Sequence, residues 1–93
     1  MGTRVSLGQT FKVRADIKAE GVETCVIEID LDPTYFKETH DFHTPLQLGR
    51  EKTMKRVTYT VEVVGRPTQS CIISLTAKGG DLVQQAHFNV EVL

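Results

Sequence analysis

The sequence predicts an all-β protein whose strands form an antiparallel sandwich of two sheets, with six or seven strands. Three observations lead to this prediction. Five segments alternate apolar and polar residues with a period of two, which is the pattern of strands that bury one face. Turn signals rich in glycine or proline follow most of these segments. No segment repeats its apolar residues with the period of about 3.6 that marks an amphipathic helix.

Two alternating segments come first in the chain. The segment 10–19, "TFKVRADIKA", places four apolar residues on one face: Phe11, Val13, Ala15 and Ile17. After a turn at 19–21, the segment 22–32, "VETCVIEIDLD", does the same with Cys25, Ile27, Ile29 and Leu31. Because the connection between the two segments is tight, we expect them to form a hairpin.

Three further strands are expected from residue 56 onward. In "RVTYTVEVV" (56–64), "SCIISLTAK" (70–78) and "LVQQAHFNVEVL" (82–93), alternate residues are apolar. The turn signals between them are "GRP" at 65–67 and "KGGD" at 78–81, where glycine can adopt a positive φ without steric cost. We expect three consecutive strands linked by hairpins. The predicted core of the five strands is Phe11, Val13, Ile27, Ile29, Val57, Tyr59, Val61, Ile73, Leu75, Phe88 and Val90.

The remaining segments are expected to be short or irregular. Additional strands are possible at 5–7 and 45–48, and they account for the count of six or seven. The segment 33–50 is interpreted as a long connection that crosses from one sheet to the other. Asp32 and Pro33 can begin a single helical turn over 34–38, since proline is favoured at the first helical position. Tyr35, Phe36 and Phe42 would close one end of the core.

Composition limits the classes of function. A chain of 93 residues forms one domain, residues 1–93, which we expect to be part of a larger protein. The net charge of −1 and the scattered basic residues argue against a nucleic-acid partner. Apolar runs are too short for membrane insertion, and the N-terminal residues lack the apolar core of a signal peptide.

The two cysteines, Cys25 and Cys71, match no metal-binding or redox motif. Both occupy inward positions of predicted strands, and a fibronectin-like arrangement would make those two strands neighbours in one sheet. We therefore expect two reduced, buried thiols, a state that slightly favours a cytosolic over a secreted protein.

The stretch "FKETHDFHTP" (36–45) contains the strongest candidate for site chemistry. His40 and His43 stand three apart, but zinc needs further ligands, and two such residues share a face only on a helix. Asp30 and Asp32 likewise lack further oxygen ligands for calcium. No nucleophile has the context of a catalytic motif. We therefore expect no catalytic residue, no metal and no cofactor, and an exposed polar loop around the histidines.

The order of the segments resembles that of immunoglobulin-like or fibronectin-III-like sandwiches that accompany other domains. The residues that carry the resemblance are "LGQTFKVRADIKAEGVETCVIEIDLDP" and "LQLGREKTMKRVTYTVEVVGRPTQSCIISLTAKGGDLVQQAHFNVEVL". Within that group the chain resembles the CARDB type of bacterial adhesion-related module, the last sandwiches of transglutaminases, and accessory sandwiches of bacterial signalling proteins. The chain lacks the tryptophan of antibody-type domains. The resemblance carries over no functional residue.

These observations favour a non-catalytic module that spaces domains or binds a protein partner or a neighbouring domain. An extracellular adhesion or carbohydrate-binding module is the alternative, and a fragment of a metal-dependent enzyme ranks last. Loops and unpaired strands carry function on rigid sandwiches. The expected partner surface therefore lies on the sheet edges and the 33–50 connection, and its candidate residues are Tyr35, Phe36, His40, Phe42 and His43.

Overall fold

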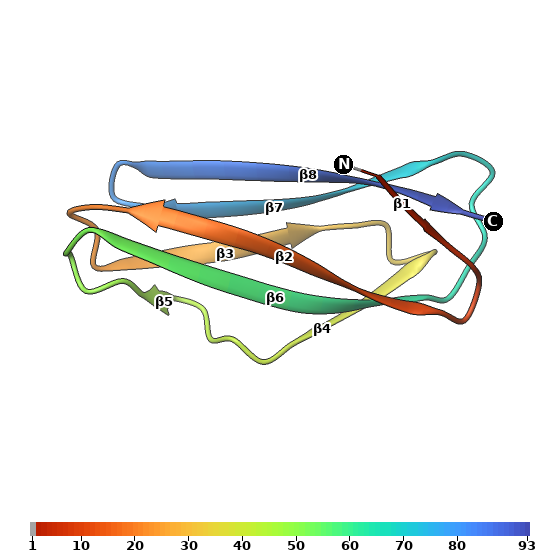
Figure 1. Cartoon of the computed structure of the whole chain (residues 1–93), viewed down its shortest axis with the longest axis horizontal. Helices are drawn as coiled ribbons and strands as arrows, with labels where there is room; N and C mark the ends of the chain where they lie inside the picture. Colours follow the sequence, from red (N-terminus) through yellow and green to blue (C-terminus); the bar gives the residue numbers. More distant parts are fainter. Residues whose placement is uncertain (1) are drawn as a thin grey trace.

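The computed structural model describes residues 2–93, and within them the chain forms eight strands. The strands are β1 (Gly2–Val5), β2 (Thr10–Ala19), β3 (Thr24–Asp30), β4 (Phe36–His40), β5 (Leu46–Gln47), β6 (Thr53–Val63), β7 (Cys71–Gly79) and β8 (Leu82–Val92). They make two sheets that face each other in an elongated sandwich of 43 × 21 × 17 Å (Figure 1). The prediction of an all-β, two-sheet fold is confirmed.

The two sheets differ in size. The larger sheet has five strands in the order β1-β8-β7-β3-β5, and the smaller sheet has three in the order β2-β6-β4. The five predicted strands correspond to β2, β3, β6, β7 and β8, and the segment 45–48 contains the short β5. The strand expected at 5–7 lies earlier, at Gly2–Val5. The count of eight exceeds the expected six or seven because a strand, β4, also forms inside the 33–50 connection.

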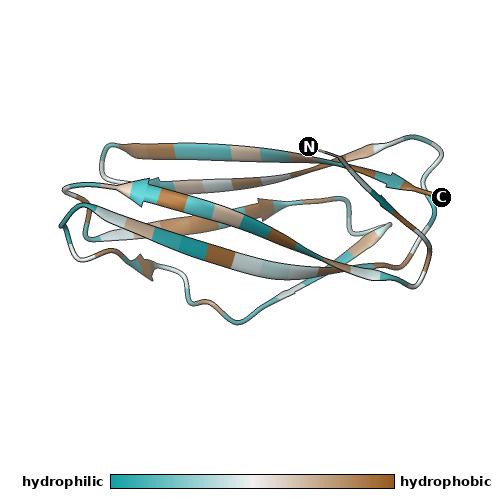
Figure 2. Ribbon diagram, viewed as in Figure 1, coloured by the Kyte–Doolittle hydropathy of each residue, from teal (hydrophilic) through white to brown (hydrophobic). Residues whose placement is uncertain are grey.

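The core lies between the sheets and follows the alternation of the sequence. Figure 2 shows apolar and polar residues alternating along β2 and β6. All eleven predicted core residues lie in the core, and three of them are only partly buried: Phe11, Ile29 and Phe88. The buried set also includes Val5, Ile17, Cys25, Phe36, Leu48, Val63 and Ala77.

The larger sheet is mixed, so the expectation of purely antiparallel sheets is wrong. Strand β1 runs parallel to β8, with Thr3 opposite Val90. The carbonyl of Val5 also accepts a hydrogen bond from the Leu93 N–H (2.8 Å). Strand β1 thus pairs with β8 on the side away from β7, and β1 itself forms an edge of the larger sheet.

Two of the expected hairpins are absent from residues 2–93. Strand β2 pairs with β6, whereas β3 pairs with β7 and β5, so β2 and β3 belong to different sheets. Strands β6 and β7 are divided between the sheets in the same way. The physical reason is that each strand has one apolar face. Two such faces can meet across the core as well as they can lie side by side, and the alternation is the same in both cases.

The predicted turn between β7 and β8 does form a hairpin. Gly79 is opposite Leu82, so the loop contains two residues, Gly80 and Asp81. Gly80 has a φ of +56°, which is the positive value that a type II′ turn requires at its first loop position. This turn fixes the register of the whole β7–β8 pair.

The 33–50 connection is more regular than expected. The carbonyl of Asp32 accepts hydrogen bonds from the N–H groups of Tyr35 (3.1 Å) and Phe36 (3.0 Å), so the predicted turn forms. It does not continue to residue 38, because Phe36–His40 pairs with β6 as strand β4. The chain then crosses to the larger sheet, where Cys25 of β3 pairs with Leu46 of β5.

The cysteines lie on adjacent strands, as expected, but at opposite ends of them. Val26 is opposite Lys78 in the β3–β7 register, so Cys25 is level with Gly79. Gly79 is eight residues from Cys71 along β7 (79 − 71), or roughly 27 Å at about 3.4 Å per residue. Both thiols are free, Cys25 is buried and Cys71 is partly buried. Burial raises the pKa of both thiols.

Candidate functional site

Strand β2 forms an open edge of the smaller sheet, where no strand of residues 2–93 pairs with its outer side. Strand β2 is ten residues long and pairs with β6 on one side. Backbone groups of alternate residues in such a strand point to opposite sides. The carbonyl of Gln9 accepts from Val63, the last residue of β6, so groups of odd-numbered residues face β6. Groups of even-numbered residues therefore face the open side.

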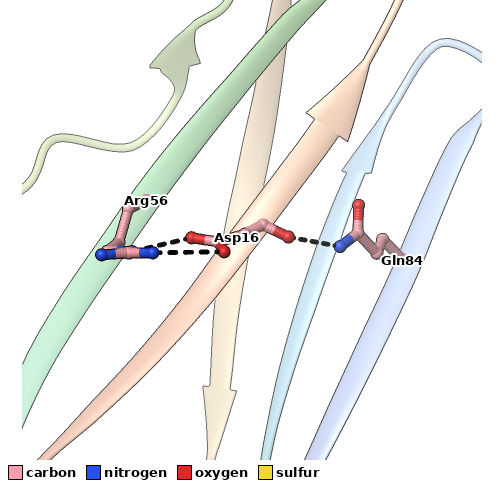
Figure 3. Close-up of polar contacts among 3 residues, drawn as sticks. All are labelled: Asp16, Arg56 and Gln84. Atoms are coloured by element: carbon pink, nitrogen blue, oxygen red, sulfur yellow. Dashed lines mark hydrogen bonds and ion pairs between the residues drawn. The ribbon is translucent and has the colours of Figure 1, made fainter.

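Gln84 of β8 covers part of this edge. Its side-chain Nε2 donates to the carbonyl of Asp16 (2.7 Å), and its Oε1 accepts from the N–H of Lys18 (3.2 Å). Figure 3 shows the first of these bonds reaching from the larger sheet to β2. One amide side chain thus supplies the donor and the acceptor that a neighbouring strand would supply. It also ties the two sheets together on this side of the sandwich.

The sequence contained a signal for Gln84 that alternation of apolar residues did not capture. Gln84 has the same phase along β8 as Leu82 and Phe88, which pack against the core. A polar side chain at an inward position must find hydrogen-bond partners or carry a desolvation cost. The phase therefore indicated a partner between the sheets, although it did not identify β2.

A groove continues the open edge beyond Gln84, toward the start of β2. It has a volume of about 300 Å³ and is lined by Thr3, Phe11, Lys12, Val13, Arg14 and Phe88. Phe11 and Phe88 come from different sheets and are both partly buried. The sandwich is thus incompletely closed at this point, where two aromatic side chains lie beside an unpaired stretch of backbone.

The cations along β2 have different surroundings. Arg56 lies opposite Asp16 in the β2–β6 pair, and its Nε donates to Oδ1 of Asp16 (2.9 Å). This hydrogen bond lowers the pKa of Asp16 and raises that of Arg56. Lys12 and Arg14, which line the groove, make no ion pair with any residue in the range 2–93.

Comparison of the sequence with models of known protein families and with curated proteins gives no significant match. Among residues 2–93 there is also no helix with the length and apolarity needed to cross a membrane. Function must therefore be inferred from the geometry of the surface.

The residues expected to form the partner surface are only partly brought together. The His40 ring stacks on Phe42, with centroids 4.3 Å apart and planes at 21°, and its Nδ1 lies 2.5 Å from Oε1 of Glu38. His43 is exposed and Tyr35 is partly buried. Phe36 has to be removed from this set, because only 2% of it is exposed and it belongs to the core.

Within residues 2–93, no group of three or more potential ligands could hold a metal ion. The hydroxyl of Tyr59, opposite His40 in the β4–β6 pair, is buried without a hydrogen-bond partner among these residues. Burial, followed by the charge of Glu38, raises the pKa of Tyr59 to about 12. This hydroxyl therefore stays protonated at neutral pH.

A second polar cluster lies on the outer face of the larger sheet. Oγ of Ser74 is 2.9 Å from Nδ1 of His87, as the hairpin register requires, and Asp30 is opposite Ser74 on the other side. In a nucleophilic triad the acid orients the histidine. Here the serine stands between the two, so the acid is not placed to do this. The register of the "KGGD" hairpin would have predicted the Ser74–His87 contact.

Proposed function

We propose that the chain is an immunoglobulin-like accessory domain that binds or positions a protein, and that it does so without catalysis. The observation that supports this most directly is the groove beside the open edge of β2. Phe11 and Phe88 remain partly exposed there, next to a strand that has no backbone partner on one side among residues 2–93. Apolar side chains beside unpaired backbone are the elements that an added strand uses for affinity and specificity.

The arrangement of the strands supports the immunoglobulin-like assignment. The last two strands form a hairpin, β7 lies next to β3 at the centre of the larger sheet, and the first strand runs parallel to the last. Domains of this kind act in many proteins as rigid platforms. A rigid sandwich 43 Å long would separate or orient the groups attached to it.

The alternative, an extracellular carbohydrate-binding module, has less support. Stacking on a sugar ring needs a flat aromatic side chain at the surface. All six aromatic residues belong to the core or pack against it: Phe11, Tyr35, Phe36, Phe42, Tyr59 and Phe88. Among these aromatic residues, Phe42 is the one that an adhesive surface could use, through its stack with His40.

Parallel selections would test the proposal against this alternative. The immobilised domain is exposed to a library of displayed random peptides and, separately, to a glycan array. We expect enrichment of peptides and no selective sugar. Hydrogen exchange with a selected peptide then locates the contact. Selective sugar binding without peptide enrichment would refute the proposal and support the carbohydrate-binding module.

A further inference from the structure

We propose that the free edge of β2 binds an acidic peptide in extended conformation, which adds to the smaller sheet as a fourth strand. This inference rests on the proposed function and specifies its partner. It depends on three features of the same stretch: an apolar groove, and, among residues 2–93, backbone groups without a strand partner and two cations without acidic partners.

The backbone of β2 offers a short ladder to an incoming strand. The N–H and C=O groups of Lys12 and Arg14 face the open side, in phase with the Asp16 and Lys18 groups that Gln84 contacts. Among residues 2–93, no backbone group pairs with β2 on this side. Gln84 itself demonstrates that a donor and an acceptor can reach this edge. A peptide strand would continue the same hydrogen bonds toward the start of β2.

The groove supplies contacts for the side chains of the added strand. Successive side chains of a strand point to opposite faces. Those that point into the sandwich would meet Phe11 and Phe88, whereas those on the outer face would lie beside Lys12 and Arg14. The ligand is therefore expected to alternate apolar and acidic residues.

The charges of Lys12 and Arg14 determine which kind of peptide strand binds to β2. Arg56 already has Asp16 as a partner, whereas Lys12 and Arg14 have none among residues 2–93. A second copy of this domain that paired edge to edge through β2 would bring like charges together, which disfavours self-association. An acidic strand would instead gain from them. Positive charge on an edge strand can also serve only to prevent pairing with other chains. That role does not account for an apolar groove beside the edge.

The probe is a capped peptide of seven residues with the sequence Glu-Val-Glu-Phe-Glu-Val-Glu. It is titrated into the domain while amide shifts and hydrogen exchange are followed by NMR. We expect saturable binding, with new protection of the Lys12 and Arg14 N–H groups. The double variant Lys12→Glu/Arg14→Glu should weaken binding by about tenfold or more, because charges at the rim of a contact govern encounter and orientation.

Two controls separate strand addition from general attraction between charges. Lys37→Glu reverses one positive charge on β4, at the opposite edge of the same sheet, and should alter the affinity by less than about twofold. The single variant Lys12→Glu makes the same change in charge on β2 and should weaken binding by more than Lys37→Glu does. A peptide methylated on the backbone nitrogens that face β2 keeps its charge but cannot donate, and it should not bind. Thermal melts establish that all the protein variants are folded.

Several results would overturn the proposal. They are the absence of saturable binding, unchanged exchange at Lys12 and Arg14, equal losses from the single β2 and β4 variants, or retained binding of the methylated peptide. The selection described above separates this failure from that of the proposed function. If selected peptides bind at the 33–50 connection, a protein-binding role stands and the β2 inference fails. If no peptide is selected and the seven-residue probe does not bind, both fail.

Discussion

Replacing Gln84 tests whether this residue holds the open side of the sandwich together. Gln84→Met keeps the length of the side chain and removes both hydrogen bonds, to Asp16 and to Lys18. Each bond contributes about 1 kcal/mol, and the two backbone groups left behind lie at an edge where water can reach them in part. We therefore expect the free energy of unfolding to fall by about 2 kcal/mol, which corresponds to a decrease in Tm of roughly 8–16 °C for a domain of this size.

The neighbouring residue provides a matched control. Gln85 points outward from β8 and makes one long, exposed side-chain contact, 3.4 Å to Oγ1 of Thr76. Gln85→Met should change the free energy of unfolding by less than about 0.5 kcal/mol, as surface substitutions usually do. Urea unfolding measured in parallel gives the difference between the two variants.

Hydrogen exchange tests the same prediction at a single backbone amide, that of Lys18. The N–H of Lys18 donates to Gln84 and should be protected in the native protein. In Gln84→Met this amide should exchange much faster, while the amides that pair β2 with β6 keep most of their protection. The reasoning is refuted if Gln84→Met matches Gln85→Met in stability, or if exchange at Lys18 does not change.

Three further predictions concern the core and the thiols. The pKa of Tyr59 rises from its ordinary value of 10.0 to about 12 in the folded protein, so between about pH 10 and pH 12 Tyr59 ionises in the unfolded chain but not in the folded one. The free energy of unfolding should therefore fall over this range by up to ~1.4 kcal/mol per pH unit. Urea unfolding at several alkaline pH values measures this decrease. After air oxidation, both Cys25 and Cys71 should still titrate as thiols in denaturant, with Cys25 reacting slowly in the native state; loss of thiols from the monomer would contradict the observed register. A Cβ at Gly79 would overlap backbone of β3, so Gly79→Ala should cost about 3 kcal/mol or more in chemical unfolding, while the exposed Lys78→Ala should cost less than about 0.5 kcal/mol.

The existence of most strands could be predicted from the sequence, because one buried face imposes a period of two on any strand. The pairing of the strands could not. The segments 10–19 and 22–32 look like a hairpin, yet their strands face each other across the core. The connection between them is held instead by the segment before β6, where the N–H of Gly21 donates to the carbonyl of Arg50 (2.9 Å). That contact joins residues far apart in sequence, so no local pattern reveals it.

Strand β4 escaped prediction for a related reason. Phe36, Glu38 and His40 lie opposite Val63, Val61 and Tyr59, and directly opposed residues of a pair point to the same face. Glu38 and His40 therefore occupy core-facing positions with polar side chains. Because β4 is an edge strand, these side chains reach the rim of the sandwich and contact each other there. A search for alternating apolar residues overlooks such a strand.

The two edges of the smaller sheet consequently have opposite characters. On β4, the core-facing positions toward the rim hold a carboxylate and an imidazole that contact each other, and the imidazole stacks on Phe42. On β2, the core-facing positions hold Phe11, Val13, Ala15 and Ile17, and apolar surface reaches the groove. Gln84 covers the far part of that edge and leaves Lys12 and Arg14 uncovered. An added strand would bury apolar surface at β2, whereas at β4 it would have to separate or desolvate a polar pair. The asymmetry therefore favours β2 over β4 as the edge that receives a partner.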